Sequence, residues 1–134
     1  PMAQAEGLGV ITYSPLGGGL LTGKYAGATA PSAGRFLTDT IYQRRFGEEG
    51  VKDAARRFVA LARERGLNPV SLAIAWVARH PGVTAPIIGA RNVEQLEACL
   101  ASQTVELTPE LYPELCALTP PPPLATDRND ELPG

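Results

Sequence analysis

The chain has 134 residues, which is enough for one domain with a buried core but not for two. Its hydrophobic fraction of 44% and charged fraction of 19% are typical of a soluble globular protein. The formal net charge is -2 and the basic residues are mixed with acids, which argues against nucleic acid or an acidic membrane surface as a partner. No apolar run approaches the roughly 18 residues that a membrane span needs.

The first predicted element is a short strand over 9–13, where the β-branched run Val-Ile-Thr follows a glycine. Its apolar character predicts burial on both faces. The segment 14–34 follows with six glycines and two prolines, which indicates a long functional loop.

Two helices are predicted next. Over 48–65 apolar residues recur at spacings of three and four, charged residues take the other face, and Gly66 provides a stop. The second helix begins with Asn68 as its cap and Pro69 in its first turn. It is apolar nearly all round, so we expect it to be deeply packed, with Trp76 in the core.

A second buried strand is predicted over 85–89, and a helix begins at Asn92, where Gln95 completes a variant of the capping box. The apolar face of that helix consists of Val93, Leu96 and Leu100. A short helix over 108–118 follows. We expect the proline-rich tail over 119–134 to be poorly ordered.

Strands that alternate with helices indicate an α/β fold with parallel pairing. Two strands alone make no stable sheet, so the pattern predicts a piece of something larger. The chain also opens on Pro1 and not on Met, which is what a processed, cut or truncated chain would show.

The cysteines and the histidine favour no metal site. Cys99 and Cys116 form no Cys-x-x-Cys pair, and His80 is far from both in sequence and is expected at the surface. A disulfide between the two cysteines is the alternative to two reduced, largely buried thiols in a cytoplasmic protein, which is the simpler interpretation.

The first motif that could carry chemistry is the glycine-rich segment over 13–25, at the end of the first strand. Its three consecutive glycines let backbone N–H groups approach an anion, and Lys24 adds a positive charge. A mobile surface loop has the same composition. The segment also matches most of a nucleotide triphosphate P-loop, but Tyr25 stands where that motif needs Ser or Thr.

The second motif is the strand–glycine–helix junction over 86–96. A capped helix N-terminus offers unpaired N–H groups and a partial positive charge, and Arg91 beside it can hold a phosphate with two hydrogen bonds. Taken alone, such a junction can also be just a tight turn.

Together the two motifs resemble the C-terminal part of aldo-keto reductases. The similarity is carried by Ser-Pro-Leu at 14–16, by Gly-Leu-Leu-x-Gly-Lys-Tyr at 19–25, and by Pro-Ile-Ile-Gly-Ala-Arg-Asn-x-Glu-Gln-Leu at 86–96. It covers roughly 5–118 and is strongest to the branch of the potassium-channel β subunits and their bacterial relatives. The resemblance implies a segment of a (β/α)8 TIM barrel that holds strands seven and eight, where barrel phosphate sites commonly lie.

The resemblance also implies an NADP site. Tyr13 would stack on the nicotinamide, and Arg91 would lie near the 2′-phosphate. The pyrophosphate would be lined by Ser14, Pro15, Leu16, Gly17 and Gly18, largely through backbone, with Thr22 and Lys24 also contacting phosphate. Arg35 would belong to the segment that closes over the cofactor, and Gly89 and Gln95 would hold the adenosine end. Relatives carry Glu-Asn where this chain has Ala98-Cys99, and those side chains usually face the adenine. We therefore expect a reduced affinity for the cofactor.

The resemblance assigns no catalytic residue to this chain, because the family's Asp, Tyr, Lys and His come from earlier strands. The full-length activity it implies is reduction of aldehydes or ketones with NADPH, with residues 1–118 as the cofactor-binding part. The partners would then be NADPH and the remainder of the barrel, or a second copy of the chain. The alternative is a non-catalytic nucleotide-binding or interaction module derived from a truncated reductase.

Overall fold

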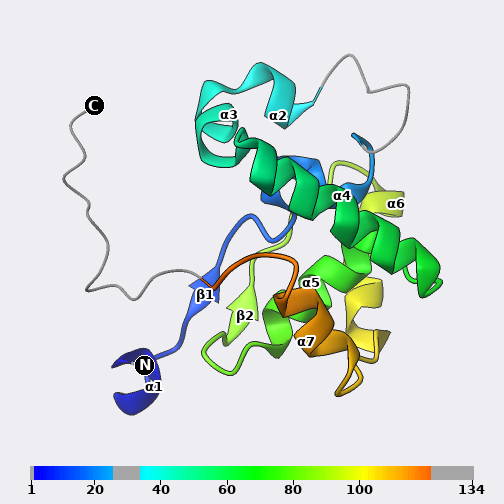
Figure 1. Cartoon of the computed structure of the whole chain (residues 1–134). Coiled ribbons are helices and arrows are strands. Elements are labelled where there is room, and N and C mark those ends of the chain that lie inside the picture. Colours follow the sequence, from blue (N-terminus) through cyan, green and yellow to red (C-terminus); the bar gives the residue numbers. More distant parts are fainter. Residues whose placement is uncertain (1, 26–33, 122–134) are drawn as a thin grey trace.

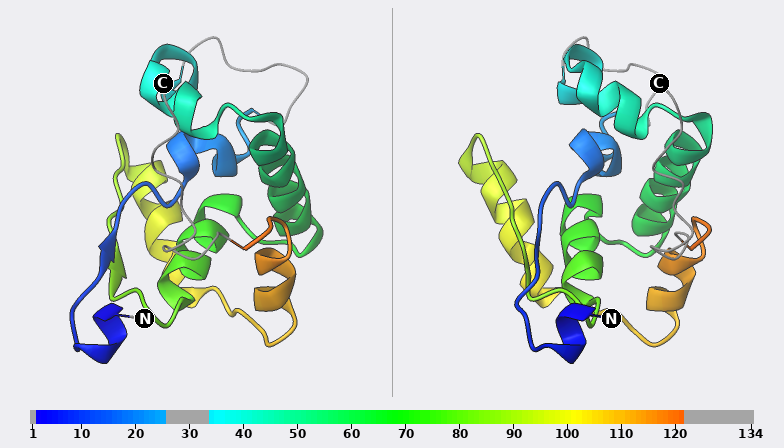
Figure 2. Two further views of the ribbon diagram at one scale, coloured as in Figure 1. Left: turned by 60° about the vertical axis from the view of Figure 1, so that its left-hand side comes forward. Right: turned by 90° about the vertical axis from the view of Figure 1, so that its left-hand side faces the viewer.

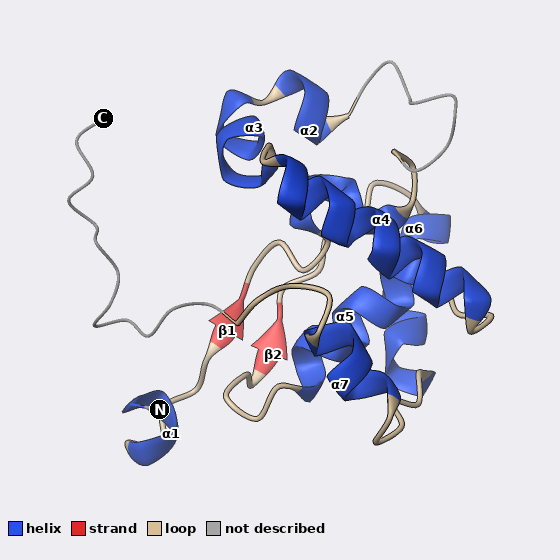
Figure 3. Ribbon diagram, viewed as in Figure 1, coloured by secondary structure: helices blue, strands red, loops and turns tan. Residues whose placement is uncertain are grey.

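The structure is a computed structural model that describes residues 2–25 and 34–121; residues 1, 26–33 and 122–134, which include most of the predicted tail, lie outside the described part. The described chain is mainly helical, with two short strands (Figure 3). None of its helices is long and apolar enough to cross a membrane.

Four helices make up most of the packed core. They are α4 (Glu49–Glu64), α5 (Pro69–Arg79), α6 (Val93–Leu100) and α7 (Leu111–Cys116). Both views in Figure 2 show α5 between α6 on one side and the pair α4 and α7 on the other. The buried cluster joins α4, α5 and α7 through Phe58, Val59, Leu61, Ala62, Leu72, Ala73, Leu111 and Leu115.

The predicted helix signals of α4 and α5 are confirmed. Gly66 adopts φ +67° just after α4, where the N–H of Leu67 donates to the carbonyl of Ala62 over 2.8 Å and so closes the helix end. The side-chain oxygen of Asn68 accepts from the N–H of Val70 over 2.8 Å and caps α5. Trp76 packs against the buried cluster as expected.

The two strands pair in parallel, as the alternation of elements predicts, but they are shorter and more exposed than expected. β1 (Ile11–Thr12) and β2 (Ala85–Pro86) pair in the register Ile11 to Ala85 and Thr12 to Pro86. Ile11 is 67% exposed and Ile87 is 53% exposed, so the prediction of burial on both faces is wrong. The reason is that no further strand among the described residues flanks the pair.

The prediction for α6 is right about its cap and wrong about its buried face. The side-chain oxygen of Asn92 accepts from the N–H of Gln95 over 2.9 Å. Of the helix residues only Cys99 is buried, while Val93 is 70% exposed and Leu96 and Leu100 are also exposed. The helix turns its small residues toward α5, where the hydroxyl of Ser71 donates to the carbonyl of Ala98 over 2.7 Å.

Five short elements were not predicted. They are α1 (Met2–Ala5), the 3-10 helix η1 (Gly17–Thr22), α2 (Arg35–Thr38), α3 (Thr40–Phe46) and the 3-10 helix η2 (Ala101–Thr104). Figure 1 shows α2 and α3 beyond one end of α4, on the side away from α7. Their position matters for the site, because α3 packs on the glycine-rich segment.

Candidate functional site

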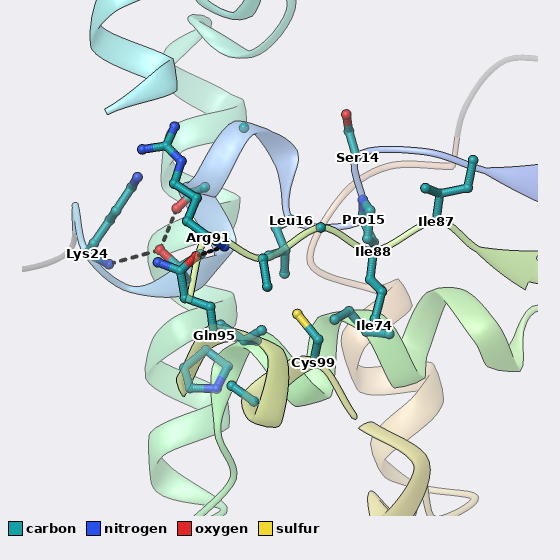
Figure 4. A pocket seen from close by; sticks show the side chains of 18 of the residues that line it. Ser14, Pro15, Leu16, Lys24, Ile74, Ile87, Ile88, Arg91, Gln95 and Cys99 are labelled. Carbon is teal, nitrogen blue, oxygen red and sulfur yellow. Dashed lines mark hydrogen bonds between the residues drawn. The ribbon is translucent and has the colours of Figure 1, made fainter. Parts of the chain in front are cut away.

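The two motif segments meet in one cleft. Because β1 and β2 run in parallel, the segments that follow them leave the same edge of the sheet. The cleft between them has a volume of about 1060 Å³ and is completed by α5, α6 and Tyr42 of α3. Figure 4 shows Lys24, Arg91 and Gln95 at one end of it and Ile74, Ile87 and Ile88 at the other. The cleft therefore has a cationic end and an apolar end.

Ten of the twelve residues that the resemblance assigns to a cofactor line this cleft. They are Tyr13, Ser14, Pro15, Leu16, Gly18, Thr22, Lys24, Gly89, Arg91 and Gln95. Gly17 is not among the residues that line it. The backbone of Arg35 begins α2, and its side chain lies outside what the structure describes.

The glycine-rich segment forms one wall of the cleft, and several of its residues adopt a left-handed backbone conformation. Ser14 has φ 58°, a conformation that a non-glycine residue adopts at a cost, and Gly17, Gly18 and Gly19 have φ values of 54°, 67° and 99°. The N–H of Gly17 donates to the carbonyl of Ser14 and that of Gly19 to the carbonyl of Leu16. These two N–H groups are therefore engaged within the segment, and an approach of other backbone N–H groups to an anion stays a prediction.

Two of the glycines also leave room for neighbouring side chains. A Cβ atom on Gly18 would lie 2.5 Å from Cδ1 of Tyr42, so only glycine lets α3 pack this closely on the segment. A Cβ on Gly19 would lie 2.9 Å from Cε of Lys24. Gly18 thus allows the ring of Tyr42 to pack on the segment, and Gly19 leaves space for the end of the Lys24 side chain.

The cationic end is built from both segments. Lys24 and Arg91 are exposed, and their side chains extend toward the same region in Figure 4. The side-chain oxygen of Gln95 accepts from the N–H of Arg91 over 3.1 Å, which holds the two residues together at the start of α6. Among the ion pairs of the described residues, none joins Arg91 to Glu94 or Glu97.

The hydroxyl of Thr22 is partly engaged by the glycine-rich segment itself. It donates to the carbonyl of Gly19 over 2.7 Å and accepts from the N–H of Lys24 over 3.4 Å. Thr22 lines the cleft, but its oxygen stabilises the turn that leads into Lys24. A direct contact of Thr22 with a phosphate stays a prediction.

At the other end, Tyr13 offers an exposed aromatic ring beside apolar side chains. The residue is 65% exposed and lines the cleft. Its hydroxyl accepts from Nη1 of Arg45 over 2.9 Å. An exposed tyrosine ring at the cleft is a surface on which a flat ring could stack.

The cysteines lie in different surroundings. Cys99 is buried at the wall of the cleft next to Ala98, and its burial raises the pKa of the thiol. Cys116 is exposed, so the expectation of two buried thiols holds for Cys99 alone; both thiols are free of disulfide. Among the described residues, no three His, Cys, Asp or Glu side chains form a group that could hold a metal ion. His80 is exposed, as expected.

Several cleft residues escaped prediction from the sequence. The start of α5 contributes Asn68, Pro69 and Val70, and the first turn of α6 contributes Glu94. Asn68 was recognised only as a helix cap. Tyr42 lies in a segment without an apolar repeat, and nothing in its local pattern indicates that it packs on Gly18.

The chain belongs to the aldo/keto reductase family, whose model matches residues 1–119. The family fold is a (β/α)8 barrel, and a parallel strand pair with its helices is consistent with part of one. Members of the family generally use NAD(P)H.

Three relatives show the breadth of the match. The chain is 34% identical over 119 residues to "Protein tas" of Escherichia coli, covering 87% of this chain and 34% of that protein. It is 37% identical over 122 residues to "Uncharacterized oxidoreductase YrpG" of Bacillus subtilis, covering 91% of this chain and 35% of that protein. It is 35% identical over 132 residues to a "Probable voltage-gated potassium channel subunit beta" of rice, covering 95% of this chain and 40% of that protein. The branch that the sequence resembles is thus confirmed, and the chain spans little more than a third of the length of these relatives.

Proposed function

We propose that this chain is the NADP-binding portion of an aldo-keto reductase-like oxidoreductase that reduces aldehydes or ketones with NADPH. The observation that carries the proposal is the common cleft, which joins residues 13–24 to residues 89–95 with two cations at one end. These are the segments that the family resemblance assigns to the cofactor. A family match over residues 1–119 supports the same assignment.

The shape and chemistry of the cleft fit a dinucleotide phosphate. Its volume of about 1060 Å³ lies at the upper end of the range for ligand sites, which suits an extended ligand. Lys24 and Arg91, at one end of the cleft in Figure 4, would face phosphate groups, and Tyr13 would receive the nicotinamide. The bound cofactor would supply hydride to a carbonyl carbon.

In this proposal β1 and β2 are the seventh and eighth strands of the barrel. The exposed Ile11 and Ile87, and the exposed apolar face of α6, are then covered by the remainder of the barrel or by a second copy of the chain. Residues 1–118 form the cofactor-binding part, and the family's proton-transfer residues are supplied by earlier strands. The chain alone is therefore catalytically inactive.

The test is calorimetric titration of the chain with NADPH, using its two lysines as a matched pair. Lys24→Met should weaken NADPH about ten-fold, because a charge-assisted phosphate contact contributes about 1.5 kcal/mol or more. Lys52→Met removes the same charge from α4, where Lys52 pairs with Glu49 over 3.5 Å, and should leave the affinity unchanged. Absence of saturable NADPH binding, or equal losses in both variants, would refute the proposal.

The second candidate is a non-catalytic nucleotide-binding or interaction module derived from a truncated reductase. It is favoured by the match to plant proteins named as probable potassium-channel β subunits. The two candidate functions can be distinguished by co-expressing the chain with the first six strands and helices of a relative's barrel and measuring carbonyl reduction. Recovery of carbonyl reduction supports the reductase, and binding without recovered reduction supports the module.

A further inference from the structure

Arg45 of α3 is held against the ring of Tyr13 by two contacts. Its Nη1 donates to the hydroxyl of Tyr13 over 2.9 Å, and its Cζ atom lies over that ring at 5.2 Å from the centroid. The same Cζ lies 5.6 Å from the ring centroid of Phe46. The guanidinium thus contacts two aromatic rings and donates to a hydroxyl.

The helix that carries Arg45 is itself fixed on the glycine-rich segment. The ring of Tyr42 packs on Gly18, and its centroid lies 6.0 Å from that of Phe46. At the start of α3, the carboxylate of Asp39 accepts from the N–H of Ile41 over 2.9 Å. The segment that forms one wall of the cleft therefore also determines where Arg45 stands.

Arg45 contacts the cleft through Tyr13. Tyr13 lines the cleft, and Arg45 is not among the described residues that do so. With 65% of Tyr13 exposed, much of its surface stays open to a ligand while the guanidinium covers part of the ring. None of the ion pairs between described residues involves Arg45, so no carboxylate there neutralises its charge.

We infer that Arg45 is a positioning residue that makes the Tyr13 site discriminate between the two oxidation states of the nicotinamide, in favour of the reduced one. The inference rests on the proposed function, in which the nicotinamide stacks on Tyr13. Oxidised nicotinamide carries a positive charge and the reduced ring carries none. A cation held in contact with Tyr13 therefore repels the oxidised nicotinamide and not the reduced one.

Coulomb's law gives the size of the effect. A ring in contact with Tyr13 lies about 4 Å from it, so the charge of that ring is at most about 9 Å from the guanidinium. For two unit charges at that separation, effective dielectric constants between 80 and 20 correspond to about a 2-fold to 20-fold change in affinity. Because this distance is close to the Debye length at about 0.1 M salt, the effect should shrink as salt is added.

The experiment measures the dissociation constants of NADP+ and NADPH for the full chain by calorimetry at low ionic strength. The quantity of interest is their ratio, because contacts with the shared phosphates and adenosine cancel in it. Arg45→Met should lower the preference for NADPH about 2-fold or more. Arg45→Lys keeps the charge and should restore most of the preference. Arg44→Met makes the same charge change one residue away on α3 and should leave the ratio as in the unaltered chain.

A purely structural role for Arg45 would weaken both cofactors equally and leave the ratio unchanged, and that result overturns the inference. If Arg45→Met fails to fold, the salt dependence of the unaltered chain decides. Its NADPH to NADP+ preference should fall as salt is raised from low ionic strength to about 0.5 M, and a salt-independent ratio overturns the inference. Absence of binding of either cofactor refutes the proposed function and this inference with it, whereas binding with an unchanged ratio refutes only the inference.

Discussion

Replacing Arg91 by Ala should remove most of the preference for NADPH over NADH. Arg91 stands at the start of the capped helix α6, where the helix dipole already favours an anion, and the described residues hold it in no ion pair with Glu94 or Glu97. A guanidinium that is not paired to a carboxylate is available for the 2′-phosphate that only NADPH carries. The loss should therefore fall on NADPH and spare NADH.

The size of the expected loss in NADPH affinity follows from the exposure of Arg91. Hydrogen bonds to charged groups contribute about 1.5–3 kcal/mol, and the lower end applies because solvent screens an exposed side chain. About 1.5 kcal/mol corresponds to about a ten-fold loss of NADPH affinity. Glu94 also lines the cleft and would repel the phosphate, so Glu94→Gln should tighten NADPH more than NADH.

Titration of both cofactors against the unaltered chain, Arg91→Ala and Arg91→Lys provides the measurement. The lysine variant keeps a charge without the bidentate geometry and should give an intermediate loss. Arg79→Ala, which removes a charge from the last turn of α5, is the control and should change neither affinity. Equal losses for NADPH and NADH in Arg91→Ala, or none for either, would show that Arg91 does not contact the 2′-phosphate.

Three further outcomes are expected. The chain alone should oxidise NADPH with a panel of aldehydes at far below about 1 per second, and ordinary enzymatic turnover would contradict the assignment of proton transfer to other segments. At micromolar concentration it should associate through the exposed Ile11, Ile87 and the apolar face of α6, and sedimentation of a stable, cooperatively unfolding monomer would contradict this. Asn68→Ala should lower the free energy of unfolding by about 1 kcal/mol in chemical denaturation, because it removes the cap of α5, and an unchanged midpoint and slope would count against the cap.

Local signals predicted the best-formed helices from the sequence alone. The apolar spacing of 48–65 and the caps Asn68 and Asn92 each depend on residues within one or two turns, and each is present in the structure. The parallel pairing of the strands also followed from the order of elements, and the family resemblance implied that the two motif segments share one site. Ten of the twelve residues assigned to the cofactor consequently line one cleft.

Features that depend on distant contacts were not predictable in this way. Whether Val93 and Leu96 are buried depends on what covers α6. An apolar stripe in the sequence does not show whether that helix face packs against this chain or against another polypeptide segment. The closeness of Tyr42 to Gly18 depends on how α3 returns over the glycine-rich segment. The engagement of the Gly17 and Gly19 N–H groups depends on the kinked 3-10 turn, which glycine content alone does not specify.

The exposed sheet and the cleft are linked through folding. No further strand among the described residues flanks the two strands that lead into the cleft, so the arrangement of the binding segments depends on the same few contacts as the stability of the chain. A ligand that binds only the folded form adds stability in proportion to the logarithm of its concentration over its dissociation constant. The apparent affinity is in turn reduced by the fraction of chain that is competent to bind. Every dissociation constant of one variant is divided by that same fraction. Ratios such as NADPH to NADH and NADPH to NADP+ therefore still report on Arg91 and Arg45, where absolute affinities would report on folding.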